Sequence, residues 1–396
     1  MIPRIRQVQI QNYKSIERAV VDLEPFTAFV GPNGAGKSNF VDVLALVRDC
    51  LSESVEQAFR KRAATNALPR WGEHYASRMA VRLLVDLTDD QEAEYSFQVE
   101  WGFREGFRVL HEKCTITGKE ERGFEVTGGQ FVRPIPGIRP QLFPDRLALA
   151  AASATEEFRP IYDFLMGIRI YSINPSNPFL LFGASESGED LQPDGVNAAA
   201  VLRSLEAHDP EVSARVSRVL SRIIEGLQGV GTYTNSGRVS LKFTKDVGED
   251  RPAEFFASEM SEGTVRVLCL LLAVYQLRKP SVLIIEEPEA TVHPAAAELV
   301  VQVLLDAAQD RQVLITTHSP DILDAKELSD ALIRVVTMEK GRTIIAPLSS
   351  ASRQAIRERL YTPGELLRIN ELSQDAEAAQ EAAQAVDLFT ETLSGS

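Results

Sequence analysis

The segment Gly31 to Ser38, with the sequence GPNGAGKS, constrains this chain more than any other feature. The apolar run before it, Thr27 to Val30, predicts a buried strand, and the apolar spacing of Asn39 to Cys50 after it predicts a helix. A strand, a glycine loop ending in Gly-Lys-Ser and a helix together wrap phosphate groups in backbone amides. We therefore predict a phosphate-binding loop in an α/β protein.

Each residue type in this loop suits the binding of a nucleotide with Mg²⁺. Lys37 supplies a cation for the β- and γ-phosphates, and the Ser38 hydroxyl is a magnesium ligand. The predicted nucleotide-binding residues of the loop are Asn33, Gly34, Ala35, Gly36, Lys37, Ser38 and Asn39. The alternative is a glycine-rich turn that ends in Lys-Ser by chance, and the flanking strand and helix favour nucleotide binding over it.

A second motif, VLIIEEPE from Val282 to Glu289, places two carboxylates at the end of a continuous apolar run. Such a run predicts a buried parallel strand, and open α/β sheets bind ligands at the carboxyl ends of their strands. Glu286 is then a predicted magnesium ligand, and Glu287 a predicted general base for an attacking water. Alternatively, the acidic residues only mark a solvated loop.

Two further motifs are TTHSP, Thr316 to Pro320, and MSEGT, Met260 to Thr264. The first ends another predicted buried strand, from which His318 can reach a γ-phosphate oxygen or the hydrolytic water, although a lone histidine is also a common structural residue. The second precedes a long helix, where Ser261 can cap and Gly263 permits close backbone approach. A helix N-terminus is also an anion site.

The rest of the chain predicts a discontinuous core with an insertion. Residues 1–50 and 255–350 alternate strand and helix, which predicts a parallel sheet. Residues 51–254 predict antiparallel strands and then a helical lobe, with helices at Ala148 to Met166, Asn197 to Ala207 and Val212 to Leu227. Residues 351–396 predict a helical, partly disordered tail that is loosely attached from Glu371 onward.

Composition excludes several classes of protein. The 396 residues carry 44% hydrophobic and 25% charged side chains, which is usual for a soluble globular protein. The longest apolar stretch, Val267 to Tyr275, is too short for a bilayer span, and no targeting segment is recognisable, so we expect a cytoplasmic protein without a membrane partner. The three cysteines, Cys50, Cys114 and Cys269, lack zinc or disulfide spacing.

The net charge of −14 opposes contact with nucleic acid unless a local basic patch provides it. One basic stretch follows the first predicted helix, and its members are Arg60, Lys61, Arg62, Arg70, Arg78 and Arg82. Such a stretch is either a phosphate-contacting surface or an ordinary solvated face. Double-stranded DNA is therefore a candidate ligand.

Taken in order, these motifs resemble those of the ABC-type P-loop ATPases. The opening IQNYKSI with EEPE, an HP pair and THSP is similar to the soluble RecF-like and OLD-like branch, which is related to SMC proteins. The resemblance covers roughly residues 1–50 and 255–322. It implies an ABC-ATPase head with a parallel core sheet around the phosphate loop, an antiparallel β subdomain and a helical inserted lobe.

The resemblance also implies ATP as the nucleotide and a shared site between two subunits. Lys37 and Ser38 then belong to the Walker A motif, Glu286 and Glu287 to Walker B, and His318 is the switch histidine. Ser261, Glu262 and Gly263 stand where the family's signature motif meets ATP held by the opposite protomer. We therefore expect a head-to-tail homodimer that hydrolyses ATP and switches a separate effector, nuclease-like or toxin-like, in DNA repair or anti-phage defence.

Several departures from the family pattern leave alternatives open. Glu286 stands where much of the family has aspartate, which points to slow hydrolysis and keeps a non-hydrolysing nucleotide sensor in view. The family's Q-loop glutamine has no clear counterpart, with Gln141 only one candidate, and Lys14 and Ser15 carry little weight as nucleotide contacts. No long heptads and no fused nuclease domain are recognisable. A transporter motor subunit is the remaining alternative.

Overall fold

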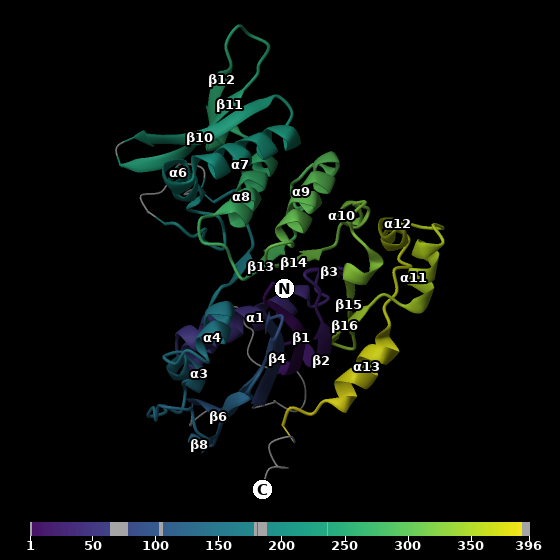
Figure 1. Ribbon diagram of the computed structural model, residues 1–396. Coiled ribbons are helices and arrows are strands. Elements are labelled where there is room, and N and C mark those ends of the chain that lie inside the picture. The colour runs from purple at the N-terminus through teal and green to yellow at the C-terminus, as the bar shows by residue number, and fades with distance from the viewer. Residues whose placement is uncertain are drawn as a thin grey trace.

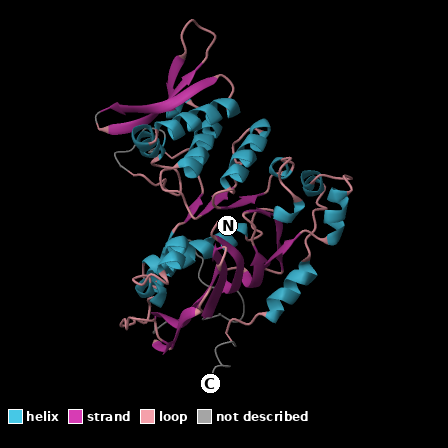
Figure 2. Ribbon diagram, viewed as in Figure 1, coloured by secondary structure: helices cyan, strands magenta, loops and turns pink. Residues whose placement is uncertain are grey.

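The computed structural model describes residues 2–63, 78–102, 106–177, 180, 188–235 and 237–389. Figure 1 shows a central sheet with an antiparallel sheet on one side and a lobe of helices on the other. Figure 2 shows that the lobe carries its own small sheet, far from the antiparallel one. No helix among these residues is long and apolar enough to cross a bilayer.

The central sheet has six strands in the order β16-β15-β3-β14-β13-β9. Their bounds are β3 Phe26–Val30, β9 Ile168–Tyr171, β13 Val282–Glu286, β14 Gln312–Thr317, β15 Ile333–Glu339 and β16 Arg342–Pro347. All neighbours are parallel except the β15–β16 hairpin. The predicted α/β fold with a parallel core sheet is confirmed, and the carboxyl ends of β3, β14, β13 and β9 share one edge.

This sheet separates two apolar cores, which explains why its inner strands β3, β13 and β14 are mostly apolar. Phe29, Ile284 and Leu314 face the core that α1 shares with the antiparallel sheet. The alternate residues Ala28 and Ile285 face the core that holds the helices of the lobe. Because side chains alternate along a strand, a strand buried on both faces shows no polar alternation.

The antiparallel sheet runs in the order β2-β1-β4-β5-β6-β7-β8. Its strands are β1 Arg4–Tyr13, β2 Ile16–Asp22, β4 Arg78–Thr88, β5 Gln91–Gly102, β6 Gly106–Thr117, β7 Arg122–Thr127 and β8 Gln130–Arg133. The predicted antiparallel pairing is confirmed, and β1 pairs with both β2 and β4. This sheet therefore runs across the domain boundary that the sequence suggests at residue 50, and β9 likewise joins the core sheet from within the expected insertion.

Helices α1 Lys37–Ser52, α2 Val55–Ala63, α3 Ala148–Ala152 and α4 Arg159–Met166 lie beside the antiparallel sheet. The single helix predicted for Ala148 to Met166 is wrong, because turns separate α3 from α4. Pro160 lies in the first turn of α4, where its missing N–H costs nothing. Proline therefore starts a new helix here instead of continuing the old one.

The lobe contains α6 Ala198–His208, α7 Pro210–Ile223, α8 Glu262–Tyr275 and α9 Pro294–Ala307, with a small sheet ordered β10-β11-β12. The three strands are β10 Leu227–Asn235, β11 Arg238–Lys245 and β12 Ala253–Phe256. The sequence predicts none of them. Gly229 and Gly231 interrupt β10, so a half-buried alternation is not recognisable there.

The C-terminal part contains α10 Pro320–Leu323, α11 Ser350–Arg357, α12 Pro363–Arg368 and α13 Ala376–Ala385. The expected loose attachment from Glu371 is wrong as far as Phe389, because this segment docks on both sheets (Figure 1). Leu388 is buried, its N–H donates to Gln11 Oε1 at 3.0 Å, and its carbonyl accepts from Gln98 Nε2. The expected disorder of the last residues, 390–396, lies outside the described residues.

Candidate nucleotide site

The phosphate loop joins β3 to α1 with a backbone that requires glycine. Gly34 has φ 80° and Gly36 has φ 103°, in the left-handed region that glycine enters without steric cost. Gly36 is also the N-cap of α1, so no capping side chain covers the first amides of the helix. These open amides are suited to bind an anion. Asn33 and Gly34 are exposed at the tip of the loop.

Lys37 is buried beneath this loop. Its Nζ donates to Gly31 O at 2.7 Å and to Pro32 O at 3.1 Å. Burial lowers the pKa of the Lys37 ammonium, and the carboxylates of Glu287, Glu289 and Glu286 partly oppose that shift. The loop lysine and the predicted Walker B carboxylates therefore act on one another within a single site.

Residues that are distant in sequence support the phosphate loop through hydrogen bonds. Thr343 of β16 donates to Ala35 O at 3.0 Å, and its Oγ1 lies 2.6 Å from Ser15 Oγ. Asn39 Nδ2 donates to the same Ser15 hydroxyl at 2.6 Å. A methyl group on Gly36 would overlap the Thr343 side chain. Asn39, predicted as a nucleotide ligand, is thus already bonded to a support, and Thr343 is a site residue that the sequence analysis missed.

A groove of about 430 Å³ runs along α1 from the phosphate loop, and its lining includes Ser38, Glu286 and Ser172. Ser38 lies in the first turn of α1, Glu286 ends β13, and Ser172 follows β9, so the start of one helix and the ends of two strands meet there. Mg²⁺ prefers oxygen ligands and usually takes one or two side chains together with phosphates and water. The Ser38 hydroxyl and the Glu286 carboxylate fit that requirement. Gln141 is exposed in the loop between β8 and α3 and does not line this groove.

Glu287 and His318 come together at the same edge. Glu287 has φ 48°, an unusual left-handed conformation for a non-glycine residue, and its N–H donates to Thr316 O at 2.9 Å. Its carboxylate Oε1 lies 3.4 Å from His318 Nδ1. The side chains are 37% and 44% exposed, respectively, so both can reach a ligand. The two predicted catalytic residues are therefore neighbours.

The predicted signature residues begin α8. Ser261 is its N-cap, and the Ser261 hydroxyl accepts from Thr264 N at 3.2 Å. Ser261 and Glu262 are exposed, and Glu262 Oε1 accepts from Ser176 Oγ at 2.5 Å. A methyl group on Gly263 would overlap the Thr291 carbonyl, so this glycine already serves a close approach within its own chain.

Arg266, on the same helix, links α8 to the ends of β13 and β9. Its guanidinium donates to Glu287 O at 2.8 Å, Glu286 O at 3.3 Å and Ile173 O at 2.6 Å. Burial lowers the pKa of Arg266, and Glu289 and Glu287 oppose the shift. The sequence analysis missed this residue, although one arginine within the apolar run of α8 is a signal that could have found it.

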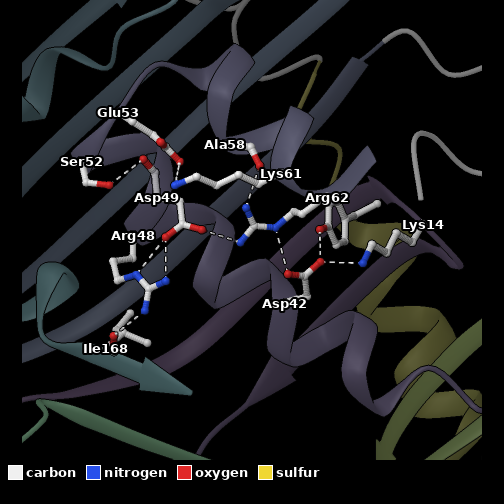
Figure 3. Close-up of polar contacts among 11 residues, drawn as sticks. Lys14, Asp42, Arg48, Asp49, Ser52, Glu53, Ala58, Lys61, Arg62 and Ile168 are labelled. Carbon is white, nitrogen blue, oxygen red and sulfur yellow. Dashed lines mark hydrogen bonds and ion pairs between the residues drawn. The ribbon is translucent and has the colours of Figure 1, made fainter. Parts of the chain in front are cut away.

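The described part of the basic stretch is neutralised by acidic partners. Figure 3 shows Arg62, which is buried and bonds Asp42 Oδ1 and Asp49 Oδ2, each at 2.9 Å. Lys61 pairs with Glu53 at 2.8 Å in the same cluster. Burial alone would raise the pKa of Asp42, but the charges of Arg62 and Lys14 outweigh it and lower that pKa.

The same holds for the other described arginines of this stretch. Arg60 pairs with Glu56 at 2.5 Å, Arg78 with Glu100 at 2.7 Å, and Arg82 with Glu94 at 3.2 Å. Arg70 lies outside the described residues. Cations that already have carboxylate partners attract phosphates less, so the stretch is mainly a network of intramolecular ion pairs.

Comparison with known proteins gives two family matches. Residues 180–324 match the family described as "AAA domain, putative AbiEii toxin, Type IV TA system", and residues 4–68 match the "AAA ATPase domain" family. The first match contains Ser261 to Gly263, the Walker B carboxylates and His318, and the second contains the phosphate loop.

Individual proteins are also similar to parts of this chain. The Old nuclease of Escherichia phage P2 is 25% identical over 359 residues, which cover 84% of this chain and 59% of the nuclease, so the chain spans about three fifths of that relative. The lipoprotein-releasing system ATP-binding protein LolD 1 of Rhodospirillum rubrum is 28% identical over 140 residues, 35% of this chain and 56% of that protein. Both similarities are partial.

Among solved structures, an Smc head bound to the C-winged helix domain of ScpA superposes with a TM-score of 0.54 at 16% identity. The superposition covers 88% of this chain and 98% of that one, and it shows a shared fold. The strand-end site, the family matches and the fold agree on one assignment. Two segments of the chain match P-loop ATPase families, and the chain is similar to the OLD-like, RecF-like and SMC-like ABC-type ATPases.

Proposed function

We propose that the chain binds ATP with Mg²⁺ between two head-to-tail copies, hydrolyses it, and uses that cycle to switch a separate effector. The observation that carries this proposal is the edge of the central sheet, where the ends of three strands, β3, β13 and β14, bring Lys37, Ser38, Glu286, Glu287 and His318 to one site. Cation, magnesium ligands and general base are the parts that phosphoryl transfer requires.

Each residue has a distinct role in this proposal. Lys37 binds the β- and γ-phosphates once these replace the Gly31 and Pro32 carbonyls as its partners. Ser38 and Glu286 hold Mg²⁺, which neutralises phosphate charge when bound. Glu287 polarises the attacking water, since its carboxylate is partly exposed, and His318 stabilises the γ-phosphate side.

The exposed start of α8 supports the head-to-tail arrangement. Ser261 and Glu262 are exposed, and none of Ser261, Glu262 and Gly263 is among the described residues that line the groove beside Ser38. The amides of this helix N-terminus are nevertheless suited to bind an anion. In a head-to-tail dimer, the second copy would place these α8 amides next to the γ-phosphate. The chain that binds the phosphate would not supply them itself.

The direct test uses the Glu287→Gln variant. This variant should bind ATP but hydrolyse it at least about a hundredfold more slowly than wild type. Because the nucleotide then persists, light scattering should show a dimer with Mg-ATP and a monomer without it. Lys37→Ala in the same experiment is the matched control and should stay monomeric. If the Glu287→Gln protein remains monomeric at saturating ATP, the proposed head-to-tail dimer is wrong.

The effector, in this proposal, is a separate nuclease-like or toxin-like protein that acts in DNA repair or anti-phage defence in the cytoplasm. The similarity to the Old nuclease of a phage and to an AAA family described as a putative AbiEii toxin supports this choice. Affinity purification of the tagged chain from its native host, with and without ATP, should recover such a partner. Recovery of a membrane subunit instead would favour the transporter-motor alternative, for which the LolD 1 similarity is the supporting observation.

A non-hydrolysing nucleotide sensor is the second alternative. It is favoured by Glu286, whose side chain is one methylene longer than the aspartate usual in the family. Phosphate release from the pure protein distinguishes the two: a rate that Glu287→Gln abolishes supports hydrolysis, and a rate indistinguishable from the buffer supports the sensor.

A further inference from the structure

Glu289, the last residue of EEPE, is bonded to the end of the neighbouring strand. Its Oε1 accepts from the Thr317 hydroxyl at 2.6 Å and from the His318 N–H at 3.2 Å. The same oxygen lies 3.7 Å from His318 Nδ1. One carboxylate oxygen therefore contacts the residue before the switch histidine, the histidine backbone and the histidine ring.

This carboxylate is buried in an unusual way. The Glu289 side chain is 9% exposed, and its recorded ion-pair partner is His318, not a lysine or arginine. Its second oxygen, Oε2, is buried without a hydrogen-bond partner among the described residues. A buried carboxylate without a tight cationic partner costs several kcal/mol. A group retained at such cost is a candidate for a functional role.

Glu287 and Glu289 both lie near His318 Nδ1, but their contacts with it differ. Glu287 Oε1 is closer, 3.4 Å from His318 Nδ1, but its side chain is 37% exposed. Glu289 is held by two hydrogen bonds that belong to the strand end itself. Glu287 is thus free to turn toward a water molecule, whereas Glu289 stays beside the ring.

We propose that Glu289 is the positioning residue for His318, an inference that rests on the proposed ATPase function. The Glu289 carboxylate keeps the proton of the neutral ring on Nδ1, so that Nε2 points to the γ-phosphate or to the water. A carboxylate that holds one ring nitrogen fixes both the tautomer and the orientation of an imidazole. Glu289 acts only through the histidine and need not contact ATP.

The first test is a double-mutant cycle in ATP hydrolysis. Glu289→Ala and His318→Ala should each lower kcat about tenfold to a hundredfold, with KM changed less than about twofold. Because Glu289 acts through His318, the double variant should be no slower than His318→Ala alone. Effects that multiply in the double variant would overturn the proposal. Glu298→Gln, an exposed carboxylate on α9, is the matched control and should behave like wild type.

A second test does not depend on activity. The chain has 5 histidines, so ¹⁵N-histidine labelling gives few ring signals, and His318→Gln assigns the one of interest. At a pH where the rings are neutral, wild type and Glu287→Gln should show the proton on Nδ1 of His318, and Glu289→Ala should lose that preference. An unchanged tautomer in Glu289→Ala would refute the positioning role. Wild-type protein that keeps this tautomer but releases no phosphate would refute only the hydrolytic function.

Discussion

The two sides of the nucleotide site differ in how completely one chain builds them. On the phosphate-loop side, Gly36 packs on Thr343, and Lys37 is bonded to loop carbonyls. On the signature side, Ser261 is exposed, and the buried atoms Arg266 Nε and Glu289 Oε2 lack hydrogen-bond partners among the described residues. The first side is therefore bonded within its own chain, whereas the second side keeps buried polar atoms without such partners.

Backbone conformation shows the same contrast. The left-handed residues of the phosphate loop are Gly34 and Gly36, for which this region is free of strain. Those on the other side are Glu287 and Thr291, for which it costs about 1 to 3 kcal/mol each. The phosphate loop is therefore free of backbone strain, whereas the turn that carries Glu287 is strained. In the proposed function, phosphate binding is then preformed, and hydrolysis follows a further change at the strained turn.

The largest expected effect is on the preformed side. Gly36→Ala adds a methyl group that overlaps Thr343 at a residue with φ 103°, so we expect loss of ATP binding and a fall in unfolding free energy of about 3 kcal/mol or more. Gly34→Ala is the control: it has φ 80° but open space around it, and should cost only about 1 to 2 kcal/mol. Calorimetry and urea unfolding give both values, and equal effects would show that packing on Thr343 is unimportant.

The next prediction concerns Glu112, on β6 of the antiparallel sheet. It is buried, and it accepts hydrogen bonds from Tyr95 and from the Ala148 and Leu149 amides that begin α3. Burial raises the pKa of Glu112 from 4.5 to about 7, although the hydrogen bonds oppose the shift. A raised pKa in the folded state means that this group stabilises the fold most below pH 4.5.

That contribution should be lost as pH rises through about 7, by about 3 kcal/mol in all. Unfolding free energy measured from pH 5 to 8 should therefore fall more in wild type than in Glu112→Gln, which does not titrate. Glu92→Gln, which changes an exposed carboxylate on the same sheet whose partner is Arg6, should keep the wild-type slope. Parallel curves for wild type and Glu112→Gln would contradict this account.

A smaller effect is expected on the signature side. Gly263→Ala would overlap the Thr291 carbonyl, but its backbone is helical, so the turn can shift at a cost of about 1 to 3 kcal/mol. ATP affinity should change little, while phosphate release should slow about tenfold, because the turn also carries Glu287 and Glu289. Glu262 is the exposed neighbour of Gly263 at the start of α8. Glu262→Ala is therefore the control that distinguishes the loss of the glycine from any change at the start of this helix. Weaker ATP binding by Gly263→Ala would show instead that Gly263 contributes to nucleotide binding.

The smallest effect concerns the basic stretch beside α1. Arg60→Ala and Lys61→Ala remove surface ion pairs with Glu56 and Glu53, so each should change unfolding free energy by no more than about 1 kcal/mol. Binding to duplex DNA, measured across a salt titration, should be weak and unaffected by either change. A salt-dependent affinity that both substitutions reduce would restore this surface as a DNA site.

The sequence was informative where local pattern decides the structure. The buried strands β3, β13 and β14 are apolar runs that end in loops with Lys37, Glu286 and His318, and a parallel sheet brings such ends together. The antiparallel strands within residues 51–254 were equally recognisable. Thus the fold class and the placement of the main candidate residues could be predicted.

What the sequence did not reveal depends on contacts between distant residues. Ser15 and Thr343 meet across 328 positions to support the phosphate loop, and nothing in either local segment indicates this. Strand β9 is only four residues long, so its pairing with β13 was not recognisable. Leu388 docks because Gln11 and Gln98 provide partners for its backbone, although its own segment resembles a solvated tail.

The central claim, a site completed by a second copy, is tested most directly by mixing two inactive variants. Lys37→Ala removes the phosphate-loop half of the site, and Ser261→Arg blocks the signature half. In a head-to-tail pair of one copy of each, one of the two sites combines an intact Lys37 with an intact Ser261. The account predicts that the mixture releases phosphate faster than either variant alone. A mixture as inactive as its components, with both variants folded and dimer formation demonstrated, would contradict it.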